Sequence, residues 1–461
     1  MKTTRVLKFG GTSMGDEHTW RMVLEIVKQY EQPVVVVSAT SRTTRQLLAA
    51  VEAAPDRYER SLEISSEIRS RHETLIRRFL QEFDHHDAAD ALEQCLAWIE
   101  KKIRDLNRHL REINKSKKTD AARKDAVASI GEQLSSGLFA TCGKVFGLNT
   151  TFMDARDIIK TNSDFGHATP DLRRINQQAR KIRQNIEQSI IPVIGGYYGE
   201  NDQGELTTLG FEGSDYTASL IGAALNCEAI EIWTDVSGIF TCDPRVVEEA
   251  RPIPEISFRE ATEMAYFGAR VLHPSTLKPA AQKEIPVYVR NIFDPGHPGT
   301  KIYSNAESGR PVRALAFLED VVIITVNAPS TLMGFRFLSN VFQILEHHHI
   351  TVDVVTTTEA SVSIALERPE KLDLVINELQ GIGEVTITEQ QGLVSLIGFG
   401  LSNVESITSR VFSSVRGGPL SLISFSRDKR NLNLVLPEQQ LIATVRSLHR
   451  SLFRTELSST S

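Results

Sequence analysis

The chain has 461 residues, enough for two or three domains, and its hydrophobic content of 41% is typical of a protein with substantial buried cores. Lysine and arginine total 52 against 58 aspartates and glutamates, so the net charge of -6 argues against a general affinity for nucleic acid or for membrane surfaces. No apolar run reaches the length of a membrane span, and the N-terminal end has no apolar signal core.

The four cysteines lie far apart with no paired spacing, which predicts reduced thiols in a cytoplasmic protein. They are Cys95, Cys142, Cys227 and Cys242. Three consecutive histidines at 347–349 precede a strand-like run. We interpret them as a loop between a helix and a strand, and we predict no metal site there.

The first distinctive stretch is KFGGTS at residues 8–13. An apolar run contains Lys8 and ends at Gly10 and Gly11. This pattern predicts a strand, then a turn, then a helix capped by Thr12 or Ser13. Such a turn directs backbone N–H groups at a ligand, and two missing side chains let a phosphate approach closely. A Gly-Gly turn after a strand is more often structural, so this stretch alone leaves both interpretations open.

The middle of the chain alternates short apolar runs with helical patterns, which predicts an α/β fold with a mostly parallel sheet and helices on both faces. The expected strands cover residues 33–38, 148–152, 191–196, 229–234 and 285–289, and the expected helices include 170–187, 216–225 and 259–268. Between residues 57 and 118, apolar residues recur at three- and four-residue steps among charges. This pattern predicts a helical insertion that lies against or over the sheet.

After a turn-rich segment at 304–311 the chain repeats itself, since residues 322–366 align without gaps with residues 392–436. Each copy reads as strand, helix, strand, strand and helix. A single repeat could reflect packing periodicity, but two ungapped copies predict a duplicated module.

Four separated motifs resemble those of the aspartokinases, a branch of the amino-acid kinase family. KFGGTS is similar to the opening of that family, and residues 206–217 resemble its TLGRGGSDYTA motif. Residues 233–245 are similar to its WTDVPGIYTTDPR segment, and residues 263–274 to its EMAxFGAKVLHP segment. Each repeat copy resembles an ACT domain. The resemblance implies a three-layer αβα sandwich with a mostly parallel sheet at 1–304, with the insertion at about 57–118, followed by two ferredoxin-like βαββαβ ACT domains at 305–391 and 392–461.

The same resemblance implies that the γ-phosphoryl group of Mg-ATP is transferred to the β-carboxylate of L-aspartate. The product would be 4-phospho-L-aspartate, the first intermediate toward lysine, threonine, methionine and isoleucine. A carboxylate is already a nucleophile at neutral pH, so catalysis requires alignment and cations but no general base.

Site residues follow from the family's motifs position by position. The catalytic pair would be Lys8 and Asp215, with Asp215 holding Lys8 in place. The substrate would contact Ser38, Thr44, Glu132, Tyr197 and Ser214. ATP would contact Lys8, Gly10, Gly11, Thr234, Asp235, Phe240, Arg245 and Arg270. Two alternatives without a catalytic role stay open. Glu132 could be an exposed helix residue, and Ser214 or Asp215 could be a helix cap.

This sequence departs from the family pattern at three positions. Phe211 replaces the arginine that grips the substrate α-carboxylate, Glu212 replaces the following glycine, and Arg270 replaces a lysine. We hypothesise that Arg42 supplies the missing cation, although it could be a solvated loop residue. We expect Arg270 to keep a phosphate contact with altered geometry.

The first repeat resembles the family's regulatory amino-acid site, with Asp353 and Glu359 placed to receive an effector ammonium. The residues implied are Thr331, Gly334, Phe337, Leu338, Val352, Asp353, Thr358 and Glu359. Lysine, threonine, both or neither remain open as effectors. We expect a homodimer or higher oligomer joined through the ACT domains.

Three functions follow from these observations. The first is an aspartate kinase with a regulatory ACT pair. The second is an amino-acid kinase with a different carboxylate substrate, favoured by Phe211. The third is a degenerate kinase that serves as an amino-acid sensor, and the retention of Lys8, Glu132 and Asp215 argues against it.

Overall fold

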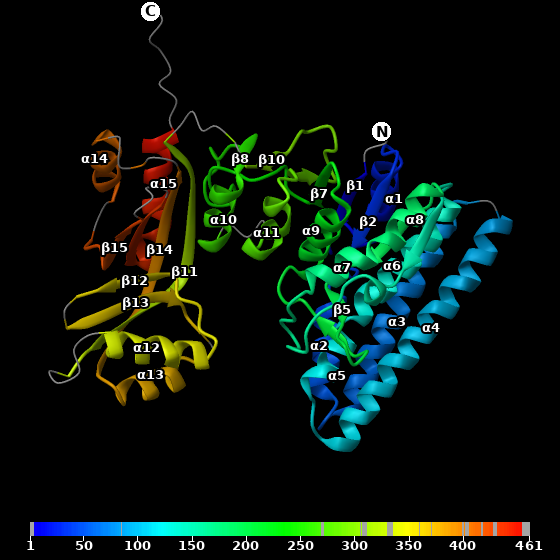
Figure 1. Cartoon of the computed structure of the whole chain (residues 1–461), viewed down its shortest axis with the longest axis horizontal. Coiled ribbons are helices and arrows are strands. Elements are labelled where there is room, and N and C mark those ends of the chain that lie inside the picture. Colours follow the sequence, from blue (N-terminus) through cyan, green and yellow to red (C-terminus); the bar gives the residue numbers. More distant parts are fainter. Residues whose placement is uncertain are drawn as a thin grey trace, which may run out of the picture. The chain divides into compact units, whose positions relative to one another are not determined.

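The structure is a computed structural model, and it divides into two compact units (Figure 1). It describes residues 4–83, 85–268, 272–304, 306, 311–329, 335–358, 360–369, 371–398, 401, 405–415, 418–426 and 431–453. The first unit comprises Met1–Ile239 and Leu272–Asn305, and the second comprises Phe240–Val271 and Ala306–Ser461. Residues 240–271, which we had predicted within the catalytic domain, group with the second unit.

A mostly parallel sheet forms the centre of the first unit. Its strands lie in the order β3 (Thr150–Met153), β4 (Ile191–Gly195), β2 (Pro33–Val37), β1 (Arg5–Phe9), β7 (Ala229–Thr234), β9 (Val287–Asn291) and β10 (Thr300–Tyr303). Every pair is parallel except β9 with β10. All five residues of β2 are buried, as expected for a central strand covered on both faces. The predicted α/β class is confirmed.

The helices of this unit follow the predicted alternation. They are α1 (Glu17–Val27), α2 (Thr43–Ala53), α3 (Tyr58–Leu80), α4 (His85–Ser116), α5 (Ala121–Ala128), α6 (Ile130–Val145), η1 (Ala155–Asp157), α7 (Leu172–Gln178), α8 (Arg180–Glu187), α9 (Gly213–Leu225) and α11 (Pro274–Gln282). A small hairpin pairs β5 (Tyr198–Glu200) with β6 (Leu206–Thr208).

The helix after the glycine turn begins later than we predicted. Asp16, rather than Thr12 or Ser13, caps α1, since its carboxylate accepts the backbone N–H of Thr19 at 2.8 Å. The Ser13 hydroxyl instead donates to the carbonyl of Trp233 at 3.3 Å, across the sheet. The residues between Gly10 and the helix therefore form an extra turn above the strand ends.

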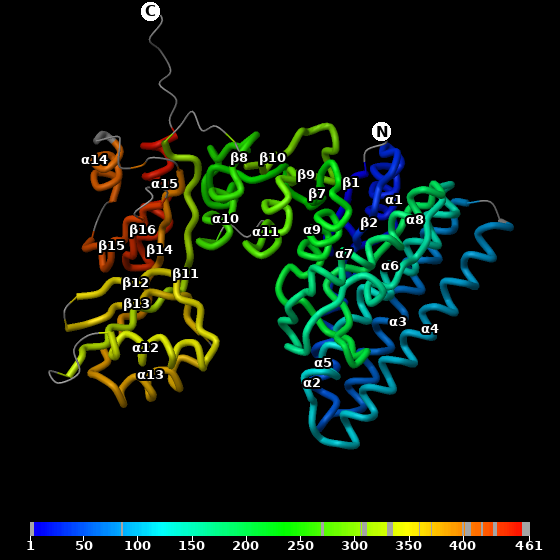
Figure 2. The backbone as a smooth tube through the Cα atoms, in the orientation of Figure 1, coloured from blue at the N-terminus to red at the C-terminus, as the bar shows by residue number. Residues whose placement is uncertain are grey.

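Two long helices form the predicted insertion, and α3 and α4 run side by side (Figure 2). Their apolar faces belong to the same core as β1 and β2. Trp98 on α4 donates its indole N–H to the carbonyl of Gln133 on α6 at 3.0 Å, and Lys102 donates to the Gln133 side chain at 2.6 Å. The insertion is thus packed into the body of the unit.

A six-stranded antiparallel sheet forms the centre of the second unit, in the order β12-β13-β11-β14-β16-β15. Its strands are β11 (Val312–Asn327), β12 (Val354–Thr357), β13 (Ser361–Glu367), β14 (Glu384–Gly398), β15 (Leu422–Phe425) and β16 (Asn431–Pro437). The other elements are β8 (Glu255–Ser257), α10 (Phe258–Tyr266), α12 (Phe335–His347), α13 (Leu372–Gln380), α14 (Glu405–Ser414) and α15 (Glu438–Phe453).

The sequence repeat corresponds to two βαββα modules that share their long strands. Residues 321–327 of β11 pair with β13 in the first module, whereas residues 312–318 pair with the part of β14 that belongs to the second. The second module therefore takes its fourth strand from residues that precede the first module. This interleaving joins both modules into one continuous sheet, where we had expected two modules in succession.

Among the described residues, no helix combines the length and the apolar character that crossing a bilayer requires.

We expect Gly137→Ala to destabilise the first unit, because a Cβ on Gly137 would lie 2.5 Å from the Trp98 ring. Alanine is favoured over glycine within a helix by about 1 kcal/mol, so a net loss must come from this contact. Overpacking of this kind costs about 1–3 kcal/mol, measurable by urea unfolding. Gly296→Ala is the control, since its nearest neighbour is an Asp294 oxygen at 3.8 Å. Equal stability of both variants would contradict the expectation.

Candidate functional site

A buried ion pair joins the end of β1 to the first turn of α9. Lys8 Nζ lies 2.5 Å from Asp215 Oδ1, and the two residues are only 8% and 5% exposed. The sequence-predicted pairing of Lys8 with Asp215 is therefore confirmed as a contact. Because an unpaired charge is costly in such a place, each residue holds the other in position.

The glycine turn beside Lys8 is not explained by packing within the protein. A Cβ on Gly10 would come no closer than 3.4 Å to any neighbour, and one on Gly11 no closer than 3.6 Å. Neither glycine has a positive φ. The Gly10 N–H donates to the carbonyl of Trp233 at 3.3 Å, which sets the turn above β7. The space over these glycines suits the close approach of a ligand's phosphate.

Close backbone contacts set the β4–β5 turn against the start of α9. A Cβ on Gly196 would lie 2.6 Å from the Ser214 Cα, and one on Gly213 would lie 2.8 Å from the Tyr197 ring. Tyr197 has a φ of 76° and donates its N–H to Thr217 Oγ1 at 3.0 Å. Two predicted substrate residues, Tyr197 and Ser214, are thus held next to Asp215.

Glu132 lies at the start of α6 and is 4% exposed, so the exposed-helix alternative is wrong. Its Oε1 accepts the Ala39 N–H at 3.2 Å, while its Oε2 is buried with no hydrogen-bond partner among the described residues. Burial raises the pKa of Glu132 from 4.5 to about 8, against the opposing effect of the Ala39 N–H. A buried carboxyl with a free oxygen is suited to receive a cationic group.

Two glycines let Glu132 reach this position. A Cβ on Gly131 would lie 2.8 Å from the Ala39 Cβ, and one on Gly195 would lie 2.8 Å from the Glu132 carbonyl oxygen. Ser38 is fixed beside them, since its N–H donates to Phe9 at 3.0 Å and its carbonyl accepts the Ser135 hydroxyl at 2.7 Å. Thr44 is the second residue of α2, which starts at the end of this loop.

Comparison with known proteins identifies the family. Residues 3–291 match the model of the amino acid kinase family. The lysine-sensitive aspartokinase 3 of Escherichia coli is 32% identical over 465 residues, covering 97% of this chain and 99% of that protein. Aspartokinase 2, chloroplastic, of Arabidopsis thaliana is 32% identical and covers 98% of this chain and 85% of that protein. The chain belongs to the aspartokinases.

The solved structures agree with this membership. The crystal structure of E. coli aspartokinase III in complex with aspartate and ADP (R-state) matches with a TM-score of 0.87 and 32% identity, covering 98% of this chain and all of that one. The complex of the same enzyme with lysine and aspartate (T-state) matches with a TM-score of 0.79. The predicted family and its fold are confirmed.

The loop before α9 carries an aromatic ring, Phe211, and a carboxyl, Glu212. Phe211 is 72% exposed and meets His273 edge to face, with ring centroids 6.1 Å apart. Glu212 has a φ of 52° and accepts the backbone N–H of His273. Burial and, secondarily, the nearby Asp215 raise the pKa of Glu212 to about 7.

Sequence reasoning missed Asp125, which is buried near the same loop. Its Oδ2 accepts the N–H of Thr208 at 2.7 Å and that of Gly166 at 2.8 Å. Burial raises its pKa, and these two hydrogen bonds oppose the rise. Asp125 therefore fixes the end of β6, four residues before Glu212. The sequence held one signal for it, because Asp125 is a carboxylate in the mostly apolar segment that leads to Glu132.

The predicted nucleotide residues are distributed over both units. Thr234 ends β7 beside the glycine turn, and its hydroxyl donates to the exposed Asp235 at 3.1 Å. Phe240 and Arg245 belong to the second unit, where Arg245 pairs with Asp243 at 2.6 Å. Arg270 lies outside the described residues. The nucleotide role of these residues stays a prediction.

The predicted effector residues that the structure describes lie in the first ACT module. Asp353 Oδ2 accepts the N–H of Glu367 at 2.9 Å, and burial raises its pKa to about 6. The Val352 carbonyl accepts the Tyr266 hydroxyl, and Thr358 shares a hydrogen bond of 2.8 Å with Ser361. Phe337 is buried in the module's core, and Leu338 packs against that core. Thr331, Gly334 and Glu359 lie outside the described residues.

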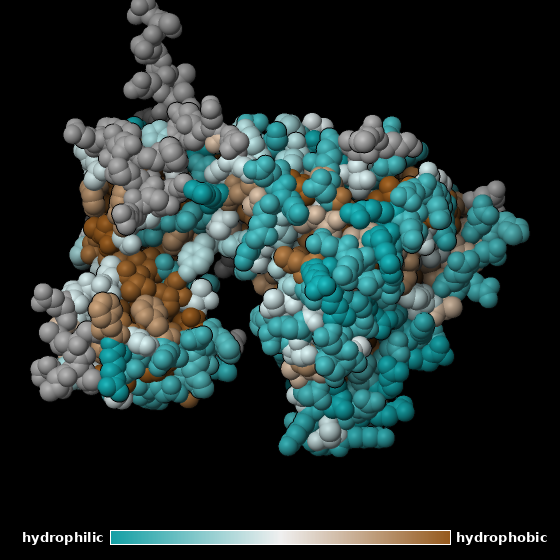
Figure 3. All heavy atoms as spheres, in the orientation of Figure 1, coloured by the Kyte–Doolittle hydropathy of each residue, from teal (hydrophilic) through white to brown (hydrophobic). Residues whose placement is uncertain are grey.

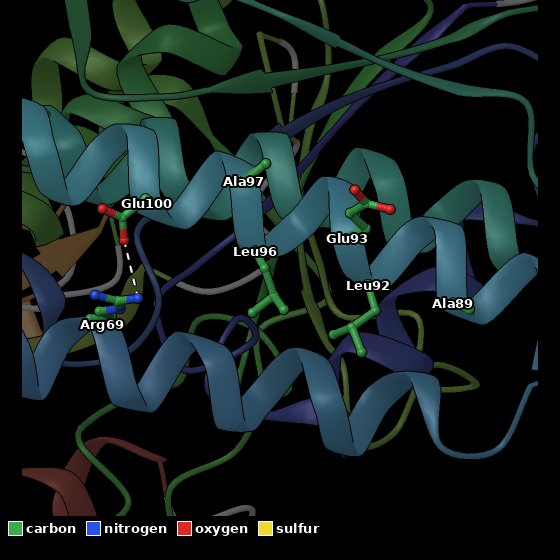
Figure 4. Close-up of a pocket in the computed structure, with 7 residues that line it drawn as sticks. All are labelled: Arg69, Ala89, Leu92, Glu93, Leu96, Ala97 and Glu100. Atoms are coloured by element: carbon green, nitrogen blue, oxygen red, sulfur yellow. Dashed lines mark ion pairs between the residues drawn. The ribbon is translucent and has the colours of Figure 1, made fainter.

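A hollow on the helical insertion is separate from these residues. Leu92 and Leu96 of α4 point toward α3 there, beside an ion pair of 3.1 Å between Arg69 and Glu100 (Figure 4). Its lining includes none of the predicted site residues. We assign the candidate aspartokinase site to the ends of β1, β2 and β4, where the polar groups converge.

We expect the pH dependence of stability to reveal the buried Glu132. The unfolded chain releases this proton near pH 4.5 and the folded protein only near pH 8, so ionisable Glu132 lowers stability as pH rises through this window. Glu132→Gln removes the cost. Its melting temperature relative to the parent protein should therefore be higher at pH 8 than at pH 5. The exposed Glu93→Gln is the control, and a pH-independent difference for Glu132→Gln would contradict the assignment.

Proposed function

We propose that this aspartokinase transfers the γ-phosphoryl group of Mg-ATP to the β-carboxylate of L-aspartate. Two neighbouring features support the proposal: the buried Lys8–Asp215 ion pair at an open glycine turn, and the carboxyl of Glu132, which has one oxygen without a hydrogen-bond partner among the described residues. The ion pair and the glycine turn suit a phosphate, and the Glu132 carboxyl suits an ammonium. E. coli aspartokinase III, the similar structure, was solved with aspartate and ADP.

Each residue has a distinct role in the proposed reaction. Glu132 receives the substrate ammonium and loses its own proton as the cation approaches. Lys8 meets the charge of the transferred group, and Asp215 keeps Lys8 aimed at it. Ser38, Thr44, Tyr197 and Ser214 border the substrate. Because the β-carboxylate attacks directly, no residue needs to remove a proton from it.

The carboxyls near the glycine turn fit a magnesium ion that accompanies the nucleotide. Mg²⁺ is usually held by one or two carboxylates, water and substrate phosphates. Burial and, secondarily, the nearby Asp215 raise the pKa of Glu212, and a divalent cation beside the two carboxyls would relieve the repulsion between them. When bound, the ion would neutralise part of the phosphate charge.

We further propose feedback regulation by an amino acid, lysine or threonine, through the first ACT module. The similar E. coli enzyme was solved with lysine, in a state named T. The partly buried Asp353, with a pKa raised to about 6, is suited to gain an ammonium partner. An effector alters the kinase only if it binds two states of the protein unequally. A cytoplasmic location stays a prediction, and the four buried, free cysteines fit a reducing compartment.

Two other functions remain as alternatives. Phe211 favours an amino-acid kinase with a different carboxylate substrate, because the family's arginine is absent. The ACT pair would also suit an inactive sensor. The buried Lys8–Asp215 pair favours a working kinase, since a sensor has no need of this costly arrangement.

An assay of acyl phosphate formation separates these functions. With Mg-ATP and hydroxylamine, we expect hydroxamate from L-aspartate and little from glutamate or N-acetylglutamate. Lys8→Met should lower kcat by about 10²–10³, the effect of removing one group that stabilises transition-state charge. Glu93→Gln, on the surface of α4, should leave kcat unchanged. Turnover of another acid would favour the second function, and tight lysine or threonine binding without turnover would favour the sensor.

We expect the ACT modules to join two copies of the chain. Apolar side chains gather over the strands of the second unit (Figure 3), and Ile423 and Phe425 project from the same face of the edge strand β15 with about four-tenths of each exposed. Replacing both with glutamate should convert a dimer into monomers in light scattering. Leu374→Glu, at an exposed position on α13, is the control. A dimer that survives the double substitution would exclude this face.

A further inference from the structure

An aspartate bound for β-phosphorylation presents a second carboxylate, at its α-carbon, which needs a cation. Position 211 offers only the exposed ring of Phe211. The other side of the substrate loop is different, because two arginines lie there, one on the helical insertion and one in the loop itself. These are Arg71 on α3 and Arg42 at the start of α2.

Arg71 is a partly buried cation without an acidic partner among the described residues. Its Nη2 donates to Thr43 Oγ1, while its Nε is buried and makes no hydrogen bond to any described group. Glu67, one turn earlier on α3, is engaged elsewhere, since it pairs with Arg60 at 3.2 Å and accepts from Gln46 at 3.5 Å. Such a guanidinium has unused donors and an unfavourable charge.

Arg42 adds a second positive charge beside the first. It is exposed, adopts a φ of 69° and precedes the first turn of α2. Burial lowers the pKa of Arg71, and repulsion from Arg42 lowers it further. The positive end of α2 strengthens the same field. The arrangement is unfavourable in the free protein, and an anion would relieve it.

A hydrogen-bonded chain fixes Arg71 against the loop. Thr43 Oγ1 lies 2.5 Å from Thr40 Oγ1, which lies 2.9 Å from Nε2 of the buried His72, the residue after Arg71. Burial lowers the pKa of His72 to about 4, so its ring is neutral at pH 7. The position of Arg71 is therefore set by packing of the insertion.

The same loop also borders Glu132. The Thr43 methyl group would lie 3.4 Å from a Cβ on Gly131, and the Ala39 N–H donates to Glu132. Glu132, which suits an ammonium, and Arg71, which suits a carboxylate, thus both contact the loop at residues 38–44. An α-amino acid presents these two groups on one carbon.

We propose that Arg71, with Arg42 beside it, receives the α-carboxylate of the amino-acid substrate, since position 211 offers no cation. The inference rests on the proposed function and adds the origin of its substrate specificity. A guanidinium can grip a carboxylate through two parallel hydrogen bonds, which gives geometric selection as well as charge.

The test compares L-aspartate with its α-amide, which keeps the reacting β-carboxylate and loses the α-charge. ADP release is measured for the full chain with Mg-ATP. Arg71→Met should raise the KM for aspartate at least tenfold, leave the KM for ATP within twofold and remove most of the preference for aspartate over the amide. Arg42→Ala should raise the KM for aspartate to a smaller extent. Arg77→Met, at an exposed position on the same helix, is the matched control.

A rescue distinguishes contact with substrate from a purely structural role. Phe211 is exposed, so Phe211→Arg should be tolerated, and in the Arg71→Met background it should restore much of the preference for aspartate. If Arg71→Met does not fold, Arg71→Lys keeps the charge and should still weaken the preference.

The outcomes separate the two proposals. A parent protein that turns over aspartate, with an unchanged preference in Arg71→Met or in its lysine counterpart, overturns this inference alone. A parent protein with no turnover of aspartate overturns the proposed function and this inference together.

Discussion

The ion pair between Lys8 and Asp215 is the interaction on which the rest of the site depends. Lys8 is fixed by β1, which pairs on both sides with parallel strands, and Asp215 is fixed by the first turn of α9. Because both charges are buried, moving either one would leave the other without a partner in an environment that solvates it poorly. In the proposed reaction, the pair therefore sets where the transferred phosphoryl group is bound, and the glycine turn beside it supplies the space.

Glycine contacts position the second half of the site. Gly131, Gly195, Gly196 and Gly213 lie where a Cβ would come within 2.8 Å of a neighbouring backbone or side chain. Each brings two chain segments closer than any larger residue allows, so the starts of α6 and α9 approach the ends of β2 and β4. Glu132 and Ser214 owe their places to this packing. Gly10 and Gly11 differ from these four, because no protein atom crowds them.

Side-chain hydrogen bonds attach the helical insertion to the rest of the first unit at two places. Trp98 and Lys102 attach α4 to α6, while His72 and Arg71 attach α3 to the substrate loop. In the proposed reaction, the insertion contributes the positive charge of Arg71 to a site whose framework belongs to the sheet.

By itself, the sequence determined the α/β class and the repeat, because hydrophobic periodicity is a local property of the chain. The family and the pairing of Lys8 with Asp215 came from the resemblance of short motifs to those of the aspartokinases. The cap of α1 was misplaced, since Thr12, Ser13 and Asp16 are all good capping residues and only the turn above the sheet selects among them. The burial of Glu132, the role of Asp125 and the contact of Arg71 with Thr43 were decided by tertiary structure alone. Each of these features depends on contacts between segments far apart in the chain. The same holds for the pairing of β11 with the part of β14 that belongs to the second ACT module. Periodicity reports which face of an element is buried, whereas the partner of that face is fixed only when the whole chain packs.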